Sequence, residues 1–415
     1  MLCSPRAERP ARFAALWALA GLLSLVLFGP ASNARATTAL TSEAKAYLFL
    51  DRMMDKYASG SQLRLVQSYE GGYLGREHFT DSFTYDDALI IDALLARGRP
   101  NDVTRAEVLG NSLLYVQRHD PAGDGRIRAA YAPTPLSSPA QVDATEPATD
   151  VGNMAWIGQA FVQLYLRTQD SAYLKGARRI GGWIQAHTYD TRGAGGYTGG
   201  RTASGSKIMW KSTEHNIDLV SLFSLLAAAT HDSVWSARAA HARRFVEAMW
   251  SPTRKLFYVG TGTDGKTINT SFLAEDVNSW SYLALRDPSY SASINWDIQH
   301  LAVHAGGFSG VSFCAGDRSG VWFEGTSHVA DALEIRHRPG DAREAAIYLA
   351  DVAHAQTSGP NTDGLGIIAA SKNGLRDCDG DRYYASLHTG ATSRYLLALR
   401  GADPFLALRQ AGSTP

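Results

Sequence analysis

Two glutamates are the strongest candidates for chemistry in this sequence. Glu214 and Glu324 each open an apolar segment with a helical repeat, and each has a tryptophan close by in the chain, Trp210 and Trp322 respectively. Apolar surroundings raise the pKa of a carboxyl, which a general acid needs at neutral pH. A second carboxyl that stays ionised can act as a base or a nucleophile. We therefore predict that these two glutamates form a catalytic pair of proton donor and proton acceptor.

Asp86 and Asp276 stand at similar openings and are the next catalytic candidates. Asp87 adjoins Asp86, and because neighbours on a helix point about 100° apart, only one of them is expected to face a shared pocket. We favour Asp86. Asp150 is better suited to cap a helix or to bind a sugar hydroxyl than to carry a proton. The helix dipole stabilises an acid in a first turn, so capping alone could explain any one of these acids.

Capping does not explain the amides, histidines and aromatic residues that accompany the acids. We predict that they contact the substrate, together with Asp150. The predicted contacts are Trp210, His215, Asn216, Trp322, Asp150, Asn153, Tyr197, Asn278 and His328.

The openings recur six times, and this recurrence predicts the fold. They are Thr84 to Asp87, Thr149 to Asn153, Thr213 to Asn216, Glu275 to Asn278, Phe323 to Thr326 and Ser386 to Thr389. A plainer, more charged helical segment precedes or follows each, near 43 to 58, 103 to 117, 171 to 188, 233 to 250, 291 to 303 and 341 to 356. Alternation of apolar and half-polar helices predicts an inner and an outer ring of about twelve helices. All six inner amino termini would then meet at one end, with Thr84, Thr149 and Thr213 as caps.

Glycine pairs followed by an aromatic residue precede three of the inner segments. They are Gly71-Gly72-Tyr73, Gly195-Gly196-Tyr197 and Gly306-Gly307-Phe308. Glycine pairs allow tight turns, so we expect short hairpins that either bring an aromatic ring to the pocket or pack it on the end of the barrel.

Composition and the amino terminus bear on location. Forty basic residues balance 40 acidic ones, which gives no attraction to nucleic acid. Residues 1–36 combine Arg6, Arg9 and Arg12 with an apolar run from Phe13 to Phe28, which is typical of a signal peptide. We predict a periplasmic or secreted protein with residues 37–415 as one domain and no stable membrane insertion after cleavage. Cys314 and Cys378 could pair in an oxidising compartment or remain free thiols.

The whole pattern resembles the six-hairpin glycosidase superfamily, whose fold is the all-α (α/α)6 toroid. The resemblance covers roughly residues 42 to 402 and is carried by phrases such as Thr84-Tyr85-Asp86-Asp87, Trp210-Lys211-Ser212-Thr213-Glu214-His215-Asn216 and Val321-Trp322-Phe323-Glu324-Gly325-Thr326. These are similar to exported bacterial proteins of polysaccharide metabolism. The resemblance implies a carbohydrate cleft at the mouth of the toroid and inverting hydrolysis by two carboxyls. Candidate partners besides the carbohydrate are components of a polysaccharide synthesis or export system.

Two other functions fit the same fold. A polysaccharide lyase could use Tyr197, His215 and Asn216, but the openings contain no arginine to neutralise a uronate. A non-catalytic glycan-binding role would not need the two glutamates. Fold alone does not decide between them.

We expect neither a metal nor another cofactor. His300 and His304 have an i, i+4 spacing but fall in a predicted outer helix, which favours a structural role. The run from Asp377 to Asp381 has the composition of a calcium loop but lacks the order and the closing glutamate of an EF-hand, so we interpret it as a turn.

Overall fold

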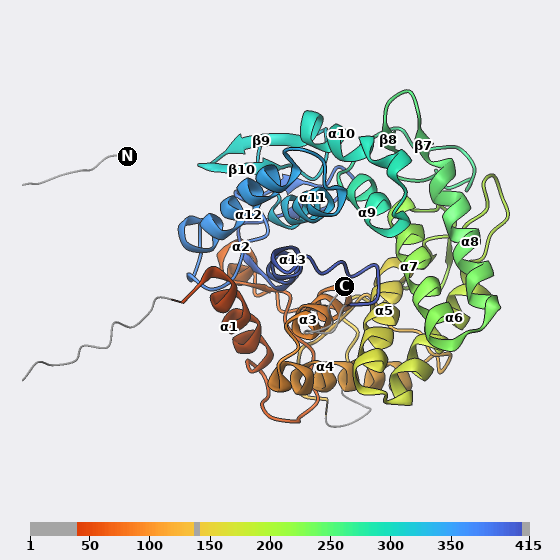
Figure 1. The fold of residues 1–415 in the computed structure, drawn as a ribbon. Helices are drawn as coiled ribbons and strands as arrows, with labels where there is room; N and C mark the ends of the chain where they lie inside the picture. Colours follow the sequence, from red (N-terminus) through yellow and green to blue (C-terminus); the bar gives the residue numbers. More distant parts are fainter. Residues whose placement is uncertain (1–39, 137–141, 409–415) are drawn as a thin grey trace, which may run out of the picture. The chain divides into compact units, whose positions relative to one another are not determined.

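The computed structural model describes residues 40–136 and 142–408, so the predicted leader at 1–36 lies outside the described residues. Twelve long helices alternate along the described chain between an inner and an outer ring (Figure 1). The predicted (α/α)6 toroid is confirmed.

The inner ring holds one helix from each repeat. Its members are α3 (Thr84–Arg97), α5 (Val151–Thr168), α7 (Thr213–Thr230), α9 (Asp276–Leu285), α11 (Phe323–Arg336) and α13 (Thr389–Leu399). Each contacts the next in this order, and α13 contacts α3, so the ring closes.

The outer ring covers the inner one. Its members are α1 (Ser42–Met54), α4 (Pro100–His119), α6 (Ser171–Thr188), α8 (Ser233–Ala248), α10 (Ala292–Leu301) and α12 (Asp341–Ser358). A short helix α2 (Gly72–Arg76) and a 3-10 turn η2 (Pro288–Tyr290) lie in the connections.

Burial explains why the two rings differ in sequence. In α3 every residue from Asp86 to Ala96 is buried, because neighbours surround this helix on most sides. In α12 the buried residues include Asp341, Ala345, Tyr348 and Val352, a single stripe of three- and four-residue steps. A helix with one wet face needs only such a stripe. The periodicity of the sequence therefore determined which ring each helix joined.

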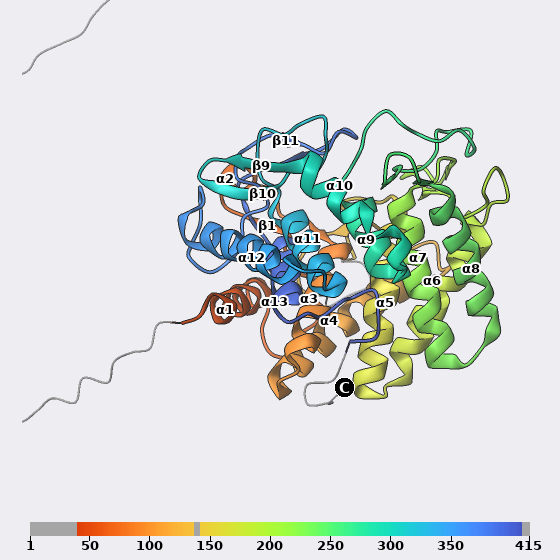
Figure 2. The same cartoon turned by 45° about the horizontal axis from the view of Figure 1, so that its top comes forward.

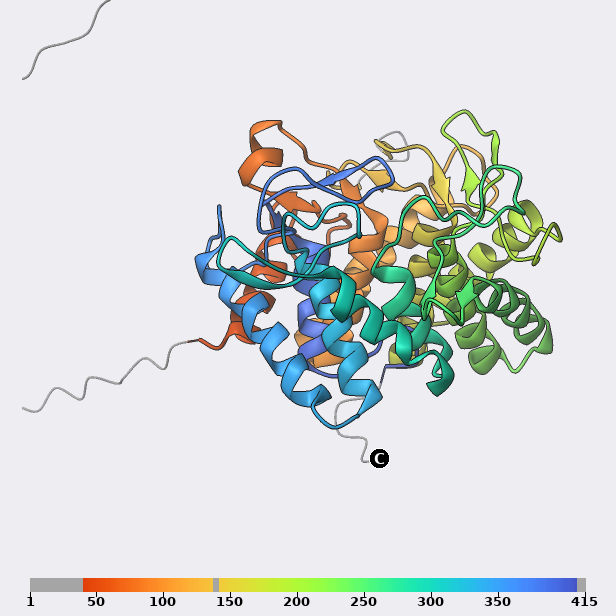
Figure 3. The same cartoon turned by 90° about the horizontal axis from the view of Figure 1, so that it is seen from above.

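Short antiparallel strands gather at the amino-terminal end of the inner helices, at the top of the view in Figure 3. They pair as β1 (Tyr69–Glu70) with β13 (Leu387–His388), β2 (Ser82–Phe83) with β3 (Ala130–Tyr131), β4 (Thr149–Asp150) with β5 (Gly200–Arg201) and β5 with β6 (Lys207–Ile208), β7 (Trp250–Ser251) with β8 (Leu256–Phe257), β9 (Ala302–Ala305) with β10 (Phe308–Val311), and β11 (Leu375–Arg376) with β12 (Arg382–Tyr383). The pairing of β1 with β13 joins the first loop of the chain to the last inner helix. Figure 2 shows β9, β10 and β11 together above α11.

The predicted threonine caps are wrong. Thr84 and Thr213 are the first residues of their helices, and their hydroxyls donate to carbonyls of neighbouring strands, Ala129 and Tyr258. Ser212 caps α7 instead, by accepting from the backbone N–H of His215. A strand that ends beside each helix offers carbonyls, and a threonine hydroxyl satisfies one of them.

A recurring side chain fastens each loop to its inner helix. In five repeats it accepts a hydrogen bond from a backbone N–H of the preceding loop, and in four of these it lies two residues after a side chain that reaches the centre. These latch residues are Asp87, Asn216, Asn278, Thr326 and Thr392, and the donors are Val66, Tyr197, Phe257, Val311 and Ile367. The polar openings therefore contain two kinds of residue: some fasten a loop to the inner helix, and others face the cavity.

Two further expectations can be compared with the structure. His300 lies in α10, but His304 lies on β9, so the predicted outer helix ends at Leu301, earlier than expected. Cys314 and Cys378 form a disulfide. In the described ranges, no helix is long and apolar enough to cross a membrane.

Candidate active site

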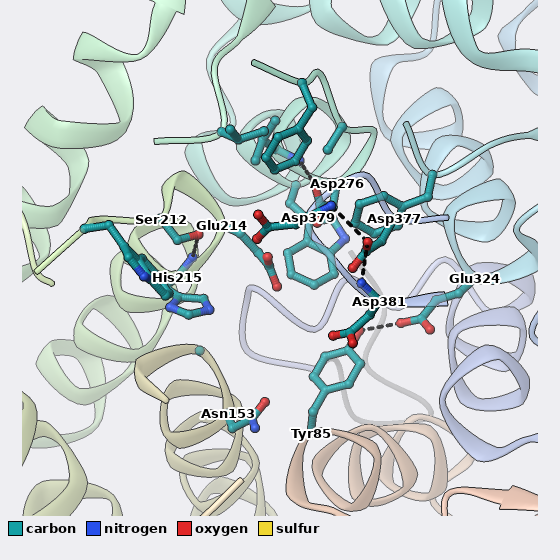
Figure 4. A pocket seen from close by; sticks show the side chains of 18 of the residues that line it. Tyr85, Asn153, Ser212, Glu214, His215, Asp276, Glu324, Asp377, Asp379 and Asp381 are labelled. Carbon is teal, nitrogen blue, oxygen red and sulfur yellow. Dashed lines mark hydrogen bonds between the residues drawn. The ribbon is translucent and has the colours of Figure 1, made fainter. Parts of the chain in front are cut away.

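A cavity of about 600 Å³ lies where the inner helices begin. Each inner helix contributes a first-turn or capping residue to its lining, and Figure 4 shows several of these side chains converging. The contributions are Tyr85 and Asp86 from α3, Asn153 and Trp156 from α5, Glu214 and His215 from α7, Asp276 and Trp280 from α9, Glu324 from α11 and His388 at the start of α13. Its size is within the usual range for small-molecule sites.

Most residues predicted from the sequence line this cavity. They are Asp86, Glu214, Asp276, Glu324, Trp210, His215, Trp322 and Asn153. Asp87 does not line it, because its carboxylate is buried and accepts from the backbone of Val66 and the hydroxyl of Ser82.

Asn216 and Asn278 are outside the cavity lining, contrary to their prediction as sugar contacts. The Asn216 amide both accepts from the N–H of Tyr197 and donates to its carbonyl, at 2.9 and 3.0 Å. The Asn278 amide accepts from Phe257 and donates to Asp297. Both are latch residues, and their polar atoms are used inside the protein.

Tyr197, Asp150 and His328 are also absent from the lining. Tyr197 is fully buried and donates to Gln185 at 2.9 Å, so its Gly-Gly loop packs the aromatic ring against the barrel end. Asp150 ends a strand before α5, where burial raises its pKa to about 6. His328 lies one turn below Glu324, with Nδ1 3.1 Å from a carboxylate oxygen of Glu275.

Glu324 sits among groups that favour its ionised form. The Tyr85 hydroxyl donates to Glu324 Oε1 at 2.5 Å, and Nδ1 of His388 lies 3.7 Å from Oε2. Burial and the neighbouring Asp86 raise the pKa of this carboxyl, while His388, Arg394 and the tyrosine hydroxyl lower it, and the net shift is upward. Of the two glutamates, Glu324 is therefore the one whose neighbours favour the carboxylate form.

His388 is a site residue that the sequence prediction left out. Its Nε2 lies 3.2 Å from Asp86 Oδ2, its Nδ1 lies 3.2 Å from the backbone nitrogen of Ala391, and its ring stacks on Tyr69 with centroids 4.2 Å apart. Burial lowers the pKa of His388, but the carboxylates of Asp86 and Glu324 raise it by more. The signal was present, because His388 belongs to the sixth polar opening.

Arg394 is also absent from the predicted site residues, because it lies outside the polar openings. It lies in α13 below the cavity, buried, with its guanidinium carbon 4.5 Å from the ring centre of Trp156 and 4.9 Å from that of Trp280. Its guanidinium donates to the Tyr85 hydroxyl at 3.3 Å. Arg394 is the single charged residue of an inner helix that is buried almost throughout, which is the signal that could have found it.

Glu214 has a different environment. No hydrogen bond to its carboxylate occurs among the described residues, and its charged neighbours are other acids. Burial raises its pKa well above the ordinary value, and Asp276, Asp218, Glu324 and Asp379 raise it further. Asp276 is similarly affected, and burial raises its pKa to about 7. Glu214 is therefore the carboxyl best supported as a proton donor.

An acidic hairpin also reaches the cavity. Asp377, Asp379 and Asp381 line it, and Figure 4 shows all three near the glutamates. Asp377 Oδ1 accepts from the backbone N–H groups of Asp379, Gly380 and Asp381, so this segment forms a turn, in agreement with its interpretation from the sequence. The disulfide from Cys378 to Cys314 attaches the turn to the segment between β10 and α11. Its position over the cavity was not readable from local sequence.

Four tryptophans line the cavity, namely Trp156, Trp210, Trp280 and Trp322. Sugar rings pack on such aromatic planes, and an indole N–H can donate to a hydroxyl. The N–H groups of Trp280 and Trp322 are buried and have no acceptor within the described chain. As for metals, residues 40–136 and 142–408 contain no cluster of three or more His, Cys, Asp or Glu side chains arranged to bind one.

Comparison with solved structures gives the same fold. A cellobiose 2-epimerase from Bacillus thermoamylovorans superposes with a TM-score of 0.62 at 9% identity, covering 85% of this chain and 98% of its own. A family 76 mannosidase from Bacteroides thetaiotaomicron gives 0.61 at 12% identity, covering 87% and 98%. An α-amylase from Clostridium perfringens gives 0.60 at 11% identity, with the same coverage. No protein-family model and no curated protein sequence matches the chain. The protein thus has the (α/α)6-toroid fold of six-hairpin sugar enzymes, which hydrolases and epimerases share.

Proposed function

We propose that the protein is an exported glycoside hydrolase that cleaves a polysaccharide or oligosaccharide with inversion. One observation carries the proposal: Glu214 and Glu324 line the same tryptophan-rich cavity in different surroundings, Glu214 among other acids and Glu324 beside Tyr85, His388 and Arg394. Glycoside hydrolysis requires this pair, a carboxylic acid for the leaving oxygen and a carboxylate for water.

The reaction follows from these roles. Glu214 donates its proton to the glycosidic oxygen while the bond from that oxygen to the anomeric carbon breaks. Glu324 accepts a proton from a water that attacks the anomeric carbon from the other face. Tyr85 holds Glu324 in place, and His388 and Arg394 favour its negative charge. The products are a new reducing end and a shortened glycan.

The arrangement of the inner ring supports inversion. Glu214 is on α7 and Glu324 on α11, and α9 stands between them in the ring. Neighbouring helix axes are about 8–10 Å apart. Carboxyls from non-adjacent helices leave room for a water between them, as the separation of about 6.5–9.5 Å in inverting enzymes requires.

Export is supported by the charged and apolar pattern of residues 1–36 and by the disulfide, because disulfides persist in oxidising compartments. Periplasmic or secreted location, and association with a polysaccharide synthesis or export system, are parts of this proposal.

The lyase alternative keeps only one of its three residues, His215, in the cavity lining. Tyr197 and Asn216 are used in packing and latching, and the single lysine or arginine in the described lining, Lys211, binds Asp190 at 3.0 Å. A uronate would therefore meet carboxylates without a free cation.

The test uses the purified protein on neutral, acidic and basic polysaccharides. We expect new reducing ends without the ultraviolet absorbance of an unsaturated uronate, and loss of this activity in Glu214→Gln and in Glu324→Gln. Glu77→Gln, an exposed change outside the cavity, is the matched control. Products are separated by chromatography, so that an unsaturated or epimerised sugar would contradict hydrolysis. Binding without any product, unaffected by either variant, would indicate a glycan-binding protein.

A further inference from the structure

The cavity is strongly acidic. Seven carboxyls line it, from Asp86, Glu214, Asp276, Glu324, Asp377, Asp379 and Asp381. Lys211 is the single lysine or arginine in this lining, and its ammonium is turned into the protein, where it binds Asp190 and donates to the carbonyls of Arg192 and Gly195. Its side chain has no exposed surface. Hydrolysis needs only two carboxyls, so the other carboxyls in the lining have another role.

The acids of the turn interact electrostatically with the acids on the cavity wall. Asp379 raises the pKa of both Glu214 and Asp276, and Asp377 raises that of Asp276. Like charges held this close oppose one another unless a positive group lies between them. The cavity therefore favours a cationic ligand electrostatically.

An unpartnered polar atom independently indicates a ligand. The Asp276 side chain lines the cavity, the residue is 5% exposed, and its one hydrogen bond within the described chain is accepted by Oδ1 from the N–H of Val277. Oδ2 has no donor. A ligand that donates a hydrogen bond to Asp276 Oδ2 would supply the contact that this oxygen does not receive from the protein.

The turn presents two acids that its own structure does not use. Asp377 makes the internal hydrogen bonds, and the disulfide fixes the adjacent Cys378. The carboxylates of Asp379 and Asp381 have no hydrogen bond among the described residues, and both residues are exposed at the cavity. They are free to bind a ligand.

We propose that the substrate is a cationic glycan, built at least partly of hexosamine units with free amino groups, and that Asp379 and Asp381 bind its ammonium groups. This inference rests on the proposed function. An ammonium group donates three hydrogen bonds and also interacts favourably with the faces of aromatic rings such as Trp280 and Trp322. A calcium ion suits the site less well, because Asp377 is used by the turn and the described acids do not form a metal-binding cluster.

The test compares oligosaccharides that differ only at one substituent. Oligomers of β-1,4-linked glucosamine, N-acetylglucosamine and glucose of matched length are titrated into the protein, and binding is followed by fluorescence of the cavity tryptophans. We expect the glucosamine oligomer to bind at least about tenfold more tightly than either of the other two oligomers. Added salt should reduce this difference, because screening weakens charge interactions.

The double variant Asp379→Asn, Asp381→Asn should bind all three oligomers equally. Asp143→Asn, an exposed change outside the lining, is the matched control and should keep the preference. Thermal unfolding of each variant checks that the fold is intact. Equal binding by the unmodified protein, or a preference that survives the double variant, would overturn the proposal. Calcium binding that requires Asp379 and Asp381, together with glucosamine binding that does not require them, would also overturn the proposal.

The outcomes separate this inference from the hydrolase proposal. Selective binding of glucosamine oligomers without cleavage of any glycan would support the inference and contradict hydrolysis. Cleavage of neutral or acetylated glycans that is unchanged in the double variant would support hydrolysis and overturn the inference.

Discussion

Glu214 and Glu324 occupy equivalent positions, the second residue of an inner helix, yet the two sides of the cavity give them different neighbours. Glu324 receives a hydrogen bond from Tyr85 and lies near His388 and, below, Arg394. Glu214 faces only carboxyls and has no hydrogen-bond donor in the described chain. The same residue type at the same place in two repeats can therefore differ in how far its neighbours favour the carboxylate form. Neighbouring repeats, not the local sequence, make the difference.

The largest effect should come from removing either carboxyl, and the two removals should differ in how they are rescued. Glu214→Gln and Glu324→Gln should each lower kcat by about a thousandfold or more. A substrate with a good leaving group should restore activity to Glu214→Gln, because that group departs without a proton. Azide should restore turnover to Glu324→Ala, because it attacks without a base. Measured rates that respond in the same way to both treatments would contradict the assigned roles.

A smaller effect is expected from Tyr85→Phe, which removes the donor to Glu324. Loss of this hydrogen bond should lower kcat/KM by about tenfold to a hundredfold. Because the hydroxyl lowers the pKa of Glu324, its loss raises that pKa. Glu324 acts when deprotonated, so the acidic limb of the profile of kcat/KM against pH should move to higher pH.

Tyr395→Phe is the matched control, because its hydroxyl bonds to Ser42 between α1 and α13, away from the cavity. An unmoved acidic limb in Tyr85→Phe, or an equal movement in the control, would count against the role of Glu324 as base.

Asp276→Asn tests the side of the cavity on which Glu214 lies. Among the charged neighbours, Asp276 contributes most to the raised pKa of Glu214, after burial. Removing this charge lowers that pKa. Glu214 acts when protonated, so the alkaline limb should move to lower pH, while kcat at the optimum should fall by less than about tenfold. Asp143→Asn is the control. Movement of the acidic limb in place of the alkaline limb would reverse the two assignments.

The smallest effect is expected at Asp150, whose helix opens the cavity with Asn153 but whose own side chain is outside the lining. Asp150→Asn should change kcat/KM by less than about twofold, since a substitution that keeps the shape of a side chain outside the site has a small effect. The comparison is made by measuring the steady-state kinetics of Asp150→Asn and Asn153→Ala side by side. A tenfold loss at Asp150 would mean that this acid reaches the substrate.

The fold could be predicted because its signals are local and repeated. Alternation of fully apolar and striped helices needs only the 3.6-residue period, and each polar opening marks a helix start. The two catalytic candidates were found in the same way. The openings mix two kinds of polar residue, and the sequence did not distinguish them. Asn216 and Asn278 looked like sugar contacts because a latch amide and a binding amide have the same chemistry.

Residues outside the openings were harder to find. Arg394 lies well inside α13, and its role depends on contacts with α3, α5 and α9. Asp379 and Asp381 were interpreted as part of a turn, which they are. Their position over the cavity depends on a disulfide that spans 64 residues of sequence.

The amino-acid sequence by itself determined the two rings, the end of the toroid at which the polar residues gather, and four of the seven carboxyls there, Asp86, Glu214, Asp276 and Glu324. Helical periodicity and burial depend on each segment separately, so a single chain is enough to read them. Only the tertiary structure decided which carboxyl has a hydrogen-bond donor, which amide is a latch and which acids meet across the cavity. Those properties depend on distances between repeats, and electrostatic effects fall with distance in space, not along the chain.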